Sequence, residues 1–169
     1  MKKDNIVLIG MPASGKSTAG VVLAKFLGYD FIDTDILIQE KTGKLLHEII
    51  SEKGPLGFKK IEEDINASVY CHKSIISPGG SVIYGERAMK HFKEIGAIVY
   101  LKLPYHEVEH RLGNLKNRGV VLQAGQTLLD LYNERAPYYE KYADIIVEEA
   151  GMSVEETIGE IARKLGISW

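Results

Sequence analysis

Residues 10–17 read GMPASGKS and fill every fixed position of the phosphate-binding pattern G-x-x-x-x-G-K-[S/T]. The run 6–9 before them is short, apolar and β-branched, which is typical of a buried strand, and residues 18–27 after them have helical periodicity. Such loops bind phosphate because their amide groups, and the N-terminus of the following helix, point at the anion. A chance glycine-rich turn that contains a lysine is the alternative, and the flanking strand and helix disfavour it.

Two side chains of the loop have expected tasks. Lys16 reaches the outer phosphates in loops of this pattern, and the hydroxyl of Ser17 binds a magnesium ion. We therefore predict a phosphate site that also holds a metal ion.

The spacing of apolar runs predicts the fold class. Strand-like runs recur at 6–9, 31–32, 74–77, 98–103 and 145–147, and the segments between them are mostly helical in pattern. Strands that alternate with helices indicate an α/β fold, in which helices cover both faces of a parallel sheet. Crossover connections in such sheets are right-handed, so the phosphate loop and the ends of the neighbouring strands open on one edge. We expect the active site at that edge.

Composition limits the partners of the chain. With 169 residues, of which 45% are hydrophobic, we expect residues 1–169 to form one domain with a sizeable core. A formal net charge of −2 gives no electrostatic case for a nucleic acid or a membrane, and leaves small anionic ligands possible. The single cysteine, Cys71, cannot form an internal disulfide, which fits a reducing compartment. We therefore expect a monomer in the cytoplasm that binds small molecules.

Two segments interrupt the alternation of strands and helices. Residues 35–73 are too long for one crossover helix, and Gly43 and the pair Gly54-Pro55 divide them into about three helices that could hold a substrate. Residues 112–125 contain glycines and basic side chains and are only weakly periodic. We interpret this second segment as a lid over the edge of the site.

Two carboxylates follow the second predicted strand at Asp33 and Asp35, where the period of a strand would point both to one side. Acidic side chains beside a phosphate loop suit a magnesium ligand and a general base. The alternative is a helix start, since Asp and Thr are good N-cap residues before the apolar run 36–38. The nearby phosphate loop favours the functional interpretation.

Glycines and arginines supply the remaining candidates. Gly79 and Gly80 follow the third predicted strand and let a ligand approach the backbone, although a plain turn is the simpler explanation when they are taken alone. Arg111 and Arg118 bracket the expected lid, and Arg135 lies further along. A planar guanidinium grips phosphate or carboxylate through two parallel hydrogen bonds. Any single arginine is otherwise an ordinary surface residue.

Taken together, these residues resemble the shikimate kinase family, small P-loop kinases that phosphorylate a hydroxyl of a cyclic hydroxy acid. The resemblance covers most of the chain. Besides the phosphate loop, it rests on DTD at 33–35, EKTG at 40–43, Gly54 with FKKIEE at 58–63, PGG at 78–80, the pair Arg111 and Arg118, and ERAPYY at 134–139.

The resemblance implies an arrangement of the chain and its cofactors. The predicted strands would form a parallel sheet of order 2-3-1-4-5, with a helical substrate-binding insertion at 35–73 and a lid at 112–125. ATP and Mg²⁺ would be the cofactors. The residues implied to bind ATP are Gly10, Ala13, Ser14, Gly15, Lys16, Ser17, Thr18, Arg111 and Arg118.

The resemblance also implies a role for each candidate side chain. Asp35 would contact the acceptor hydroxyl as base or positioner, and Arg118 would swing in with the lid to neutralise the transferring phosphate. Arg111 would pack against the adenine. The residues implied in catalysis are Asp35, Lys16 and Arg118; those implied in magnesium binding are Ser17 and Asp33; those implied in acceptor binding are Asp35, Lys59, Gly79, Gly80 and Arg135, with Arg135 on the carboxylate.

The chain departs from the family pattern on the acceptor side. Lys59 stands where the family has a carboxylate-binding arginine, Pro55 where it has a glutamate, and Pro78 where it has the first glycine of a triplet. In the expected lid, RGVV at 118–121 replaces Arg-Pro-Leu-Leu. The phosphate side is kept, so these departures bear on the identity of the acceptor.

We therefore expect ATP-dependent phosphorylation of a small hydroxy acid, most directly of shikimate to shikimate 3-phosphate. Two alternatives stay open: a kinase for another hydroxylated acid, such as homoserine or a sugar acid, and a non-catalytic nucleotide-binding module. Asp35, Arg118 and Arg135 argue against the module, because binding alone needs neither a base nor a lid arginine.

Overall fold

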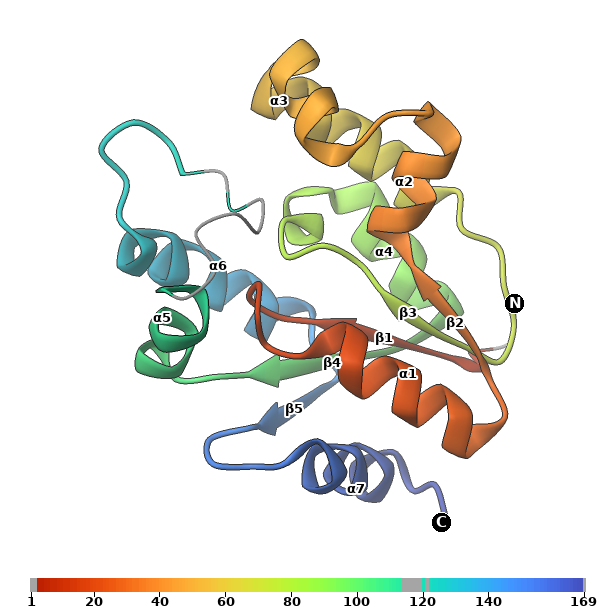
Figure 1. Ribbon diagram of the computed structural model, residues 1–169. Coiled ribbons are helices and arrows are strands. Elements are labelled where there is room, and N and C mark those ends of the chain that lie inside the picture. The colour runs from red at the N-terminus through yellow and green to blue at the C-terminus, as the bar shows by residue number, and fades with distance from the viewer. Residues whose placement is uncertain (1–2, 114–119, 121, 169) are drawn as a thin grey trace.

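A parallel sheet forms the centre of the molecule. The computed structural model of the protein describes residues 3–113, 120 and 122–168. Its five strands follow the order β2-β3-β1-β4-β5, and every neighbouring pair is parallel, as predicted (Figure 1). The strands are β1 (Asn5–Ile9), β2 (Asp30–Asp33), β3 (Ser74–Ser77), β4 (Gly96–Lys102) and β5 (Ile145–Glu148).

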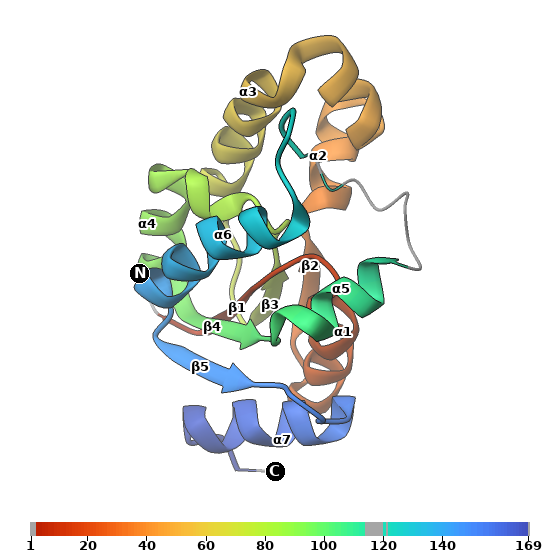
Figure 2. The ribbon, with the colours of Figure 1, turned by 90° about the vertical axis from the view of Figure 1, so that its left-hand side faces the viewer.

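Helices cover both faces of the sheet. They are α1 (Lys16–Leu27), α2 (Thr34–Thr42), α3 (Leu46–Ala67), the short 3₁₀ helix η1 (Val82–Tyr84), α4 (Glu86–Ile95), α5 (Tyr105–Gly113), α6 (Leu128–Tyr142) and α7 (Val154–Leu165). Helices α1 and α7 lie on one face, and α4, α5 and α6 on the other, while α2 and α3 rise beyond the carboxyl ends of the strands (Figures 1 and 2). None of the helices in the described ranges is long and apolar enough to cross a membrane.

Strand β1 shows how the sequence specifies this layering. Ile6 and Leu8 pack with α1 and α7, whereas Val7 and Ile9 pack with α4, α5 and α6. Side chains of a strand alternate between its faces, and a parallel sheet is covered on both. All four side chains are therefore buried, which is why β1 reads as a continuous apolar run.

The expected breaks divide the segment 35–73 as predicted. Helix α2 ends at Gly43, and α3 is interrupted at Gly54, whose φ of 71° and ψ of 173° suit glycine and end a helical run. Pro55 then starts the second part of α3, where its missing amide costs no helical hydrogen bond. A separate small core holds α2 and both parts of α3 together; it consists of Ile38, Ile49, Phe58 and Ile65.

Candidate active site

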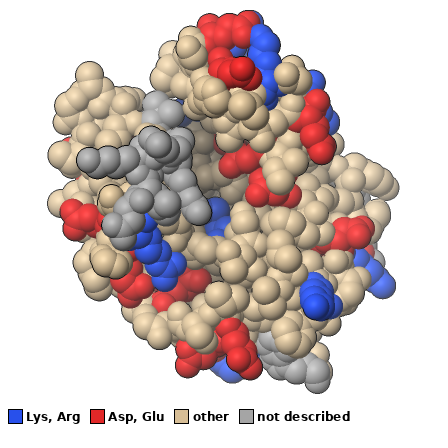
Figure 3. Space-filling view, viewed as in Figure 1, with Lys and Arg blue, Asp and Glu red and all other residues tan. Residues whose placement is uncertain are grey.

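A cavity of about 540 Å³ opens at the carboxyl ends of the strands. The phosphate loop, β2, α2, α3, the turn after β3 and α6 all contribute to its lining. The surface is hollowed between the side of α2 and α3 and the side of α5 and α6, and acidic side chains gather at the edge of the hollow (Figure 3). Its lining includes Lys16, Ser17, Asp33, Asp35, Lys59, Glu62, Gly79, Gly80, Tyr84 and Arg135.

The phosphate loop leaves the start of α1 open to an anion. No side chain caps the first turn of α1, and that turn contains no acidic residue. Its amide groups and the positive end of the helix dipole therefore favour a phosphate. A bend at Ala13, which has a positive φ of 67°, turns the backbone into the helix. The geometry of the loop fits a nucleotide phosphate.

Lys16 is held at the base of the cavity. Its ammonium donates hydrogen bonds of 2.9 Å to the carbonyl oxygens of Gly10 and Met11, and the side chain is buried. Burial lowers the pKa of Lys16 to about 8, and the nearby carboxylate of Asp35 opposes this shift. A phosphate bound at the loop would be an anionic partner for this buried ammonium, whose present hydrogen bonds go to neutral groups.

Asp33 serves two partners with its two carboxylate oxygens. One oxygen accepts from the amides of Asp35, at 2.9 Å, and Ile36, at 3.3 Å, and so caps α2. The other accepts from the hydroxyl of Ser17 at 3.2 Å, and Ser77 lies 3.4 Å from that hydroxyl. Hydroxyl and carboxylate oxygens are the ligands that Mg²⁺ prefers, so this pair fits the ion.

The strand argument for Asp33 and Asp35 is wrong in its geometry. Strand β2 ends at Asp33, and Asp35 lies in the first turn of α2. The helix-cap alternative is therefore correct for Asp33. The cap leaves room for a metal ligand at the same residue, because it uses one carboxylate oxygen and the other faces Ser17. Both side chains still line the cavity, because α2 starts at its rim.

Asp35 lies beside the turn formed by Gly79 and Gly80. Burial and the charge of Asp33 raise the pKa of Asp35 to about 6, while Lys16 opposes the rise. A Cβ atom at Gly79 would lie 2.9 Å from an Asp35 oxygen and 3.1 Å from a Glu62 oxygen. The glycine therefore leaves space between two carboxylates where an acceptor hydroxyl could lie.

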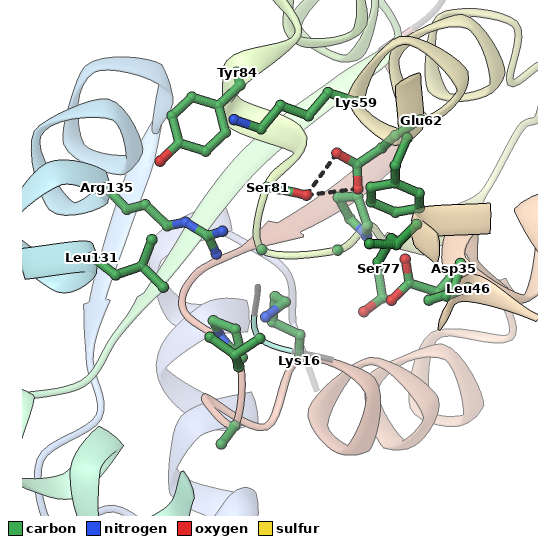
Figure 4. A pocket seen from close by; sticks show the side chains of 18 of the residues that line it. Lys16, Asp35, Leu46, Lys59, Glu62, Ser77, Ser81, Tyr84, Leu131 and Arg135 are labelled. Atoms are coloured by element: carbon green, nitrogen blue, oxygen red, sulfur yellow. Dashed lines mark hydrogen bonds between the residues drawn. The ribbon is translucent and has the colours of Figure 1, made fainter. Parts of the chain in front are cut away.

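Arg135 enters the cavity from α6 and is 7% exposed (Figure 4). Its Nε has no hydrogen-bond partner within the described part of the chain, although the atom is buried. A Cβ atom at Gly80 would lie 3.0 Å from its Nη1. Tyr139 fixes this turn by donating a 2.6 Å hydrogen bond to the carbonyl of Gly80. A buried guanidinium with an unpaired donor suits an anionic ligand.

Glu62 lines the cavity, although no role was predicted for it from the sequence. It is buried at 3% exposure, and the hydroxyl of Ser81 donates to its two oxygens at 2.7 and 2.9 Å (Figure 4). Burial raises the pKa of Glu62 to about 7; the Ser81 hydrogen bond opposes this rise, and the charge of Asp35 adds to it. Its spacing of three residues from Lys59 on one helix was a signal for a shared face.

The other predicted residues lie at different distances from the cavity. Ala13, Gly15 and Thr18 line it, as do Val120 and Gln123 of the expected lid and the adjoining Gln126. Gly10 and the buried Ser14 are part of the loop but do not line the cavity; Gly10 packs against the carbonyl of Leu101, and Ser14 lies beside the ammonium of Lys16. Arg111, on α5, contacts the phosphate loop, because its guanidinium donates to the carbonyl of Ala13 at 3.0 Å. It also pairs with Glu107 of the same helix at 3.5 Å. Arg118 lies outside the described residues.

Comparisons with known proteins agree with this architecture. The family model described as shikimate kinase matches residues 12–166. Shikimate kinase of Chlorobium chlorochromatii is 34% identical, with 95% of this chain and 90% of that protein covered. Shikimate kinase of Thermodesulfovibrio yellowstonii is also 34% identical, with 95% and 94% covered. The solved structure of shikimate kinase from Acinetobacter baumannii in complex with shikimate has a TM-score of 0.86 at 29% identity and covers 97% of this chain and 93% of that one. The chain therefore belongs to the shikimate kinase family.

Proposed function

We propose that the protein transfers the γ-phosphoryl group of ATP to a hydroxyl of a small hydroxy acid, and that this acid is shikimate. The observation that carries the proposal is the shared cavity of Lys16, Asp35 and Arg135. A phosphate loop, a carboxylate with a raised pKa and a buried cation line this one space, which supports phosphoryl transfer to an anionic acceptor. A nucleotide module without turnover needs only the first of these.

The nucleotide side would be bound by the residues of the phosphate loop. Lys16 would leave the carbonyls of Gly10 and Met11 and bind the outer phosphates, aided by the amides at the start of α1. Ser17 and Asp33 would hold Mg²⁺, which supplies charge neutralisation for the phosphates. Phosphoryl transfer requires mainly positioning and neutralisation, and these groups would provide both.

The acceptor side would be bound at the glycine turn. Arg135 would bind the carboxylate of the acid through charge-assisted hydrogen bonds, with Lys59 as a second cation and the backbone of Gly79 and Gly80 against the ring. Asp35 would then face the reacting hydroxyl and accept its proton. Its raised pKa, about 6, brings the base closer to neutral pH than an ordinary aspartate.

Two inserted segments would complete the site. Residues 35–73 would form the substrate-binding segment, and residues 112–125 the lid that brings Arg118 to the phosphates. The lining of the cavity by Val120, Gln123 and Gln126 supports a lid that closes over it. We also propose that the protein acts as a monomer in the cytoplasm.

A coupled assay of ADP release tests the activity. The full chain is given ATP and Mg²⁺ with shikimate, homoserine or gluconate, and the values of kcat/KM are compared. We expect shikimate to exceed the others by at least about a hundredfold, because its ring would lie against the glycine turn while its carboxylate reaches the two cations, Lys59 and Arg135. A preference for homoserine or gluconate would reassign the acceptor. ATP binding without ADP release for any acid would identify a nucleotide-binding module.

A further inference from the structure

The two cations at the acceptor end of the cavity, Lys59 and Arg135, both lie over the ring of Tyr84. The ammonium of Lys59, on α3, lies 4.1 Å from the centre of the Tyr84 ring, which belongs to η1 (Figure 4). The guanidinium carbon of Arg135, on α6, lies 5.6 Å from the same centre. Cations within about 6 Å of an aromatic centre are attracted by the negative face of the ring. Tyr84 therefore stabilises both cations at the place where an anion would bind.

Tyr84 is held in place through both its backbone and its ring. Its amide donates a 3.1 Å hydrogen bond to the carbonyl of Ser81, directly after the glycine turn. The ring of Tyr138, on α6, packs against it with the ring centres 5.8 Å apart. A cation that lies on Tyr84 is thus positioned relative to both the turn and α6.

Lys59 needs such support more than an arginine would. A lysine ammonium sits on a flexible stem and lacks the planar fork that orients a guanidinium. A second cavity, of about 220 Å³, is also lined by Lys59 and Tyr84, and Glu62 and Glu63 contribute to it. Without the ring, the ammonium could turn into this cavity toward the carboxylate of Glu63 and away from the acceptor.

We propose that Tyr84 is a positioning residue for the acceptor carboxylate. Its ring keeps the ammonium of Lys59 beside the guanidinium of Arg135, so that the carboxylate contacts both cations. The ring acts through these cations and takes no part in bond making or breaking. The inference rests on the proposed function, since it requires an anionic acceptor.

The test compares Tyr84→Leu with Tyr84→Phe in the full chain, by ADP release with shikimate and with its methyl ester, which lacks the negative charge. We expect Tyr84→Leu to raise the KM for shikimate about fivefold, with kcat and the KM for ATP nearly unchanged. Tyr84→Phe keeps the ring and removes only the hydroxyl, which interacts with Arg135, so its KM should stay closer to wild type than that of Tyr84→Leu. With the methyl ester, wild type and Tyr84→Leu should have equal kcat/KM. Tyr84→Gln serves in place of the leucine variant if the latter does not fold.

Two controls separate positioning from a structural role. Tyr70→Leu removes the same atoms from a side chain that is 75% exposed and lines neither cavity, so its kinetics should match wild type. In a Lys59→Met background, Tyr84→Leu should raise the KM for shikimate less than in wild type, because one of the two cations is gone.

Several outcomes would overturn the proposal. The first is an unchanged KM for shikimate in Tyr84→Leu. The second is a decrease in kcat/KM for the methyl ester in Tyr84→Leu as large as the decrease for shikimate. The third is the same rise in the KM for shikimate in the wild-type and Lys59→Met backgrounds. A wild-type protein that releases no ADP with shikimate overturns the proposed function instead, and the role of Tyr84 falls with it. The two failures are therefore distinguishable in one set of assays.

Discussion

The carboxylates of Asp35 and Glu62 approach each other across Gly79, where a single Cβ atom would lie 2.9 Å from one and 3.1 Å from the other. The negative charge of Asp35, added to burial, opposes the ionisation of Glu62. The pKa of Asp35 is raised to about 6 and that of Glu62 to about 7, chiefly by burial. The structure thus places two groups with raised pKa at the acceptor end of the cavity, and both can be titrated near neutral pH.

The first prediction concerns the pH dependence of stability. Folding raises the pKa of Glu62 from 4.5 to about 7, so the native state binds this proton more tightly than the unfolded state. The stability contributed by the protonated group is complete below the unfolded pKa and is lost as pH rises through the folded pKa. Between pH 4.5 and 8, Glu62→Gln should gain about 3 kcal/mol of unfolding free energy relative to wild type.

Urea unfolding of both proteins across this pH range measures the difference. Glu40→Gln is the control, because Glu40 is exposed on α2 and lies outside the acceptor cavity. Its curve should run parallel to that of wild type. A difference between Glu62→Gln and wild type that does not change with pH would contradict the raised pKa of Glu62.

The second prediction concerns the pH dependence of the rate. If Asp35 accepts the proton of the acceptor hydroxyl, kcat/KM should rise with pH up to its pKa of about 6 and then level off. Asp35→Asn should lower kcat by about a hundredfold or more, remove this rise, and leave the KM for ATP unchanged. Because Glu62 titrates nearby, the profile should also be recorded in Glu62→Gln. Loss of ATP binding with a retained rate would place Asp35 on the nucleotide side.

The third prediction separates the two functions of Asp33. Asparagine caps a helix about as well as aspartate, so Asp33→Asn should keep the stability of α2 while raising the Mg²⁺ concentration needed for half-maximal rate. Asp33→Ala removes the cap as well and should cost about 1 kcal/mol of unfolding free energy. Thermal unfolding and magnesium titration measure the two effects. Equal magnesium requirements in Asp33→Asn and wild type would exclude Asp33 from the metal site.

The sheet and the phosphate loop could be predicted because their signals are local. Residues 6–9 alternate between two buried faces, and the loop pattern at 10–17 specifies its own backbone. The breaks at Gly43 and at Gly54-Pro55 were equally visible, since glycine readily adopts the positive φ that ends a helix and proline is favoured where the next helical turn starts. None of these features depends on residues far away in the sequence.

The acceptor end could be predicted only in part, because it depends on packing between distant segments. Glu62 resembles any helical glutamate until α3 packs beside the turn of Ser81 and buries it. Tyr84 becomes informative only when Lys59 and Arg135, from two other helices, lie against its ring. The placement of Asp35 was wrong in detail because the strand ends two residues earlier than its acidic pattern suggested.

The last prediction concerns Lys59, whose ammonium stands where the family resemblance implies an arginine. An arginine fork binds a carboxylate through two parallel hydrogen bonds, whereas an ammonium is a strongly hydrated point charge. A guanidinium can also stack on the ring of Tyr84, so the arginine side chain should keep the contact that the Lys59 ammonium makes with this ring. Lys59→Arg should therefore lower the KM for shikimate about tenfold, with kcat unchanged.

Arg135 provides the comparison for this experiment. It is more deeply buried than any other arginine in the described residues and has an unpaired donor, so Arg135→Ala should raise the KM for shikimate more than Lys59→Ala does. If the acceptor is a smaller or differently charged acid, Lys59→Arg should crowd the cavity and reduce activity toward that acid. Unchanged kinetics in both Lys59→Ala and Lys59→Arg would mean that Lys59 is an ordinary surface lysine of α3, with Arg135 as the acceptor's cation.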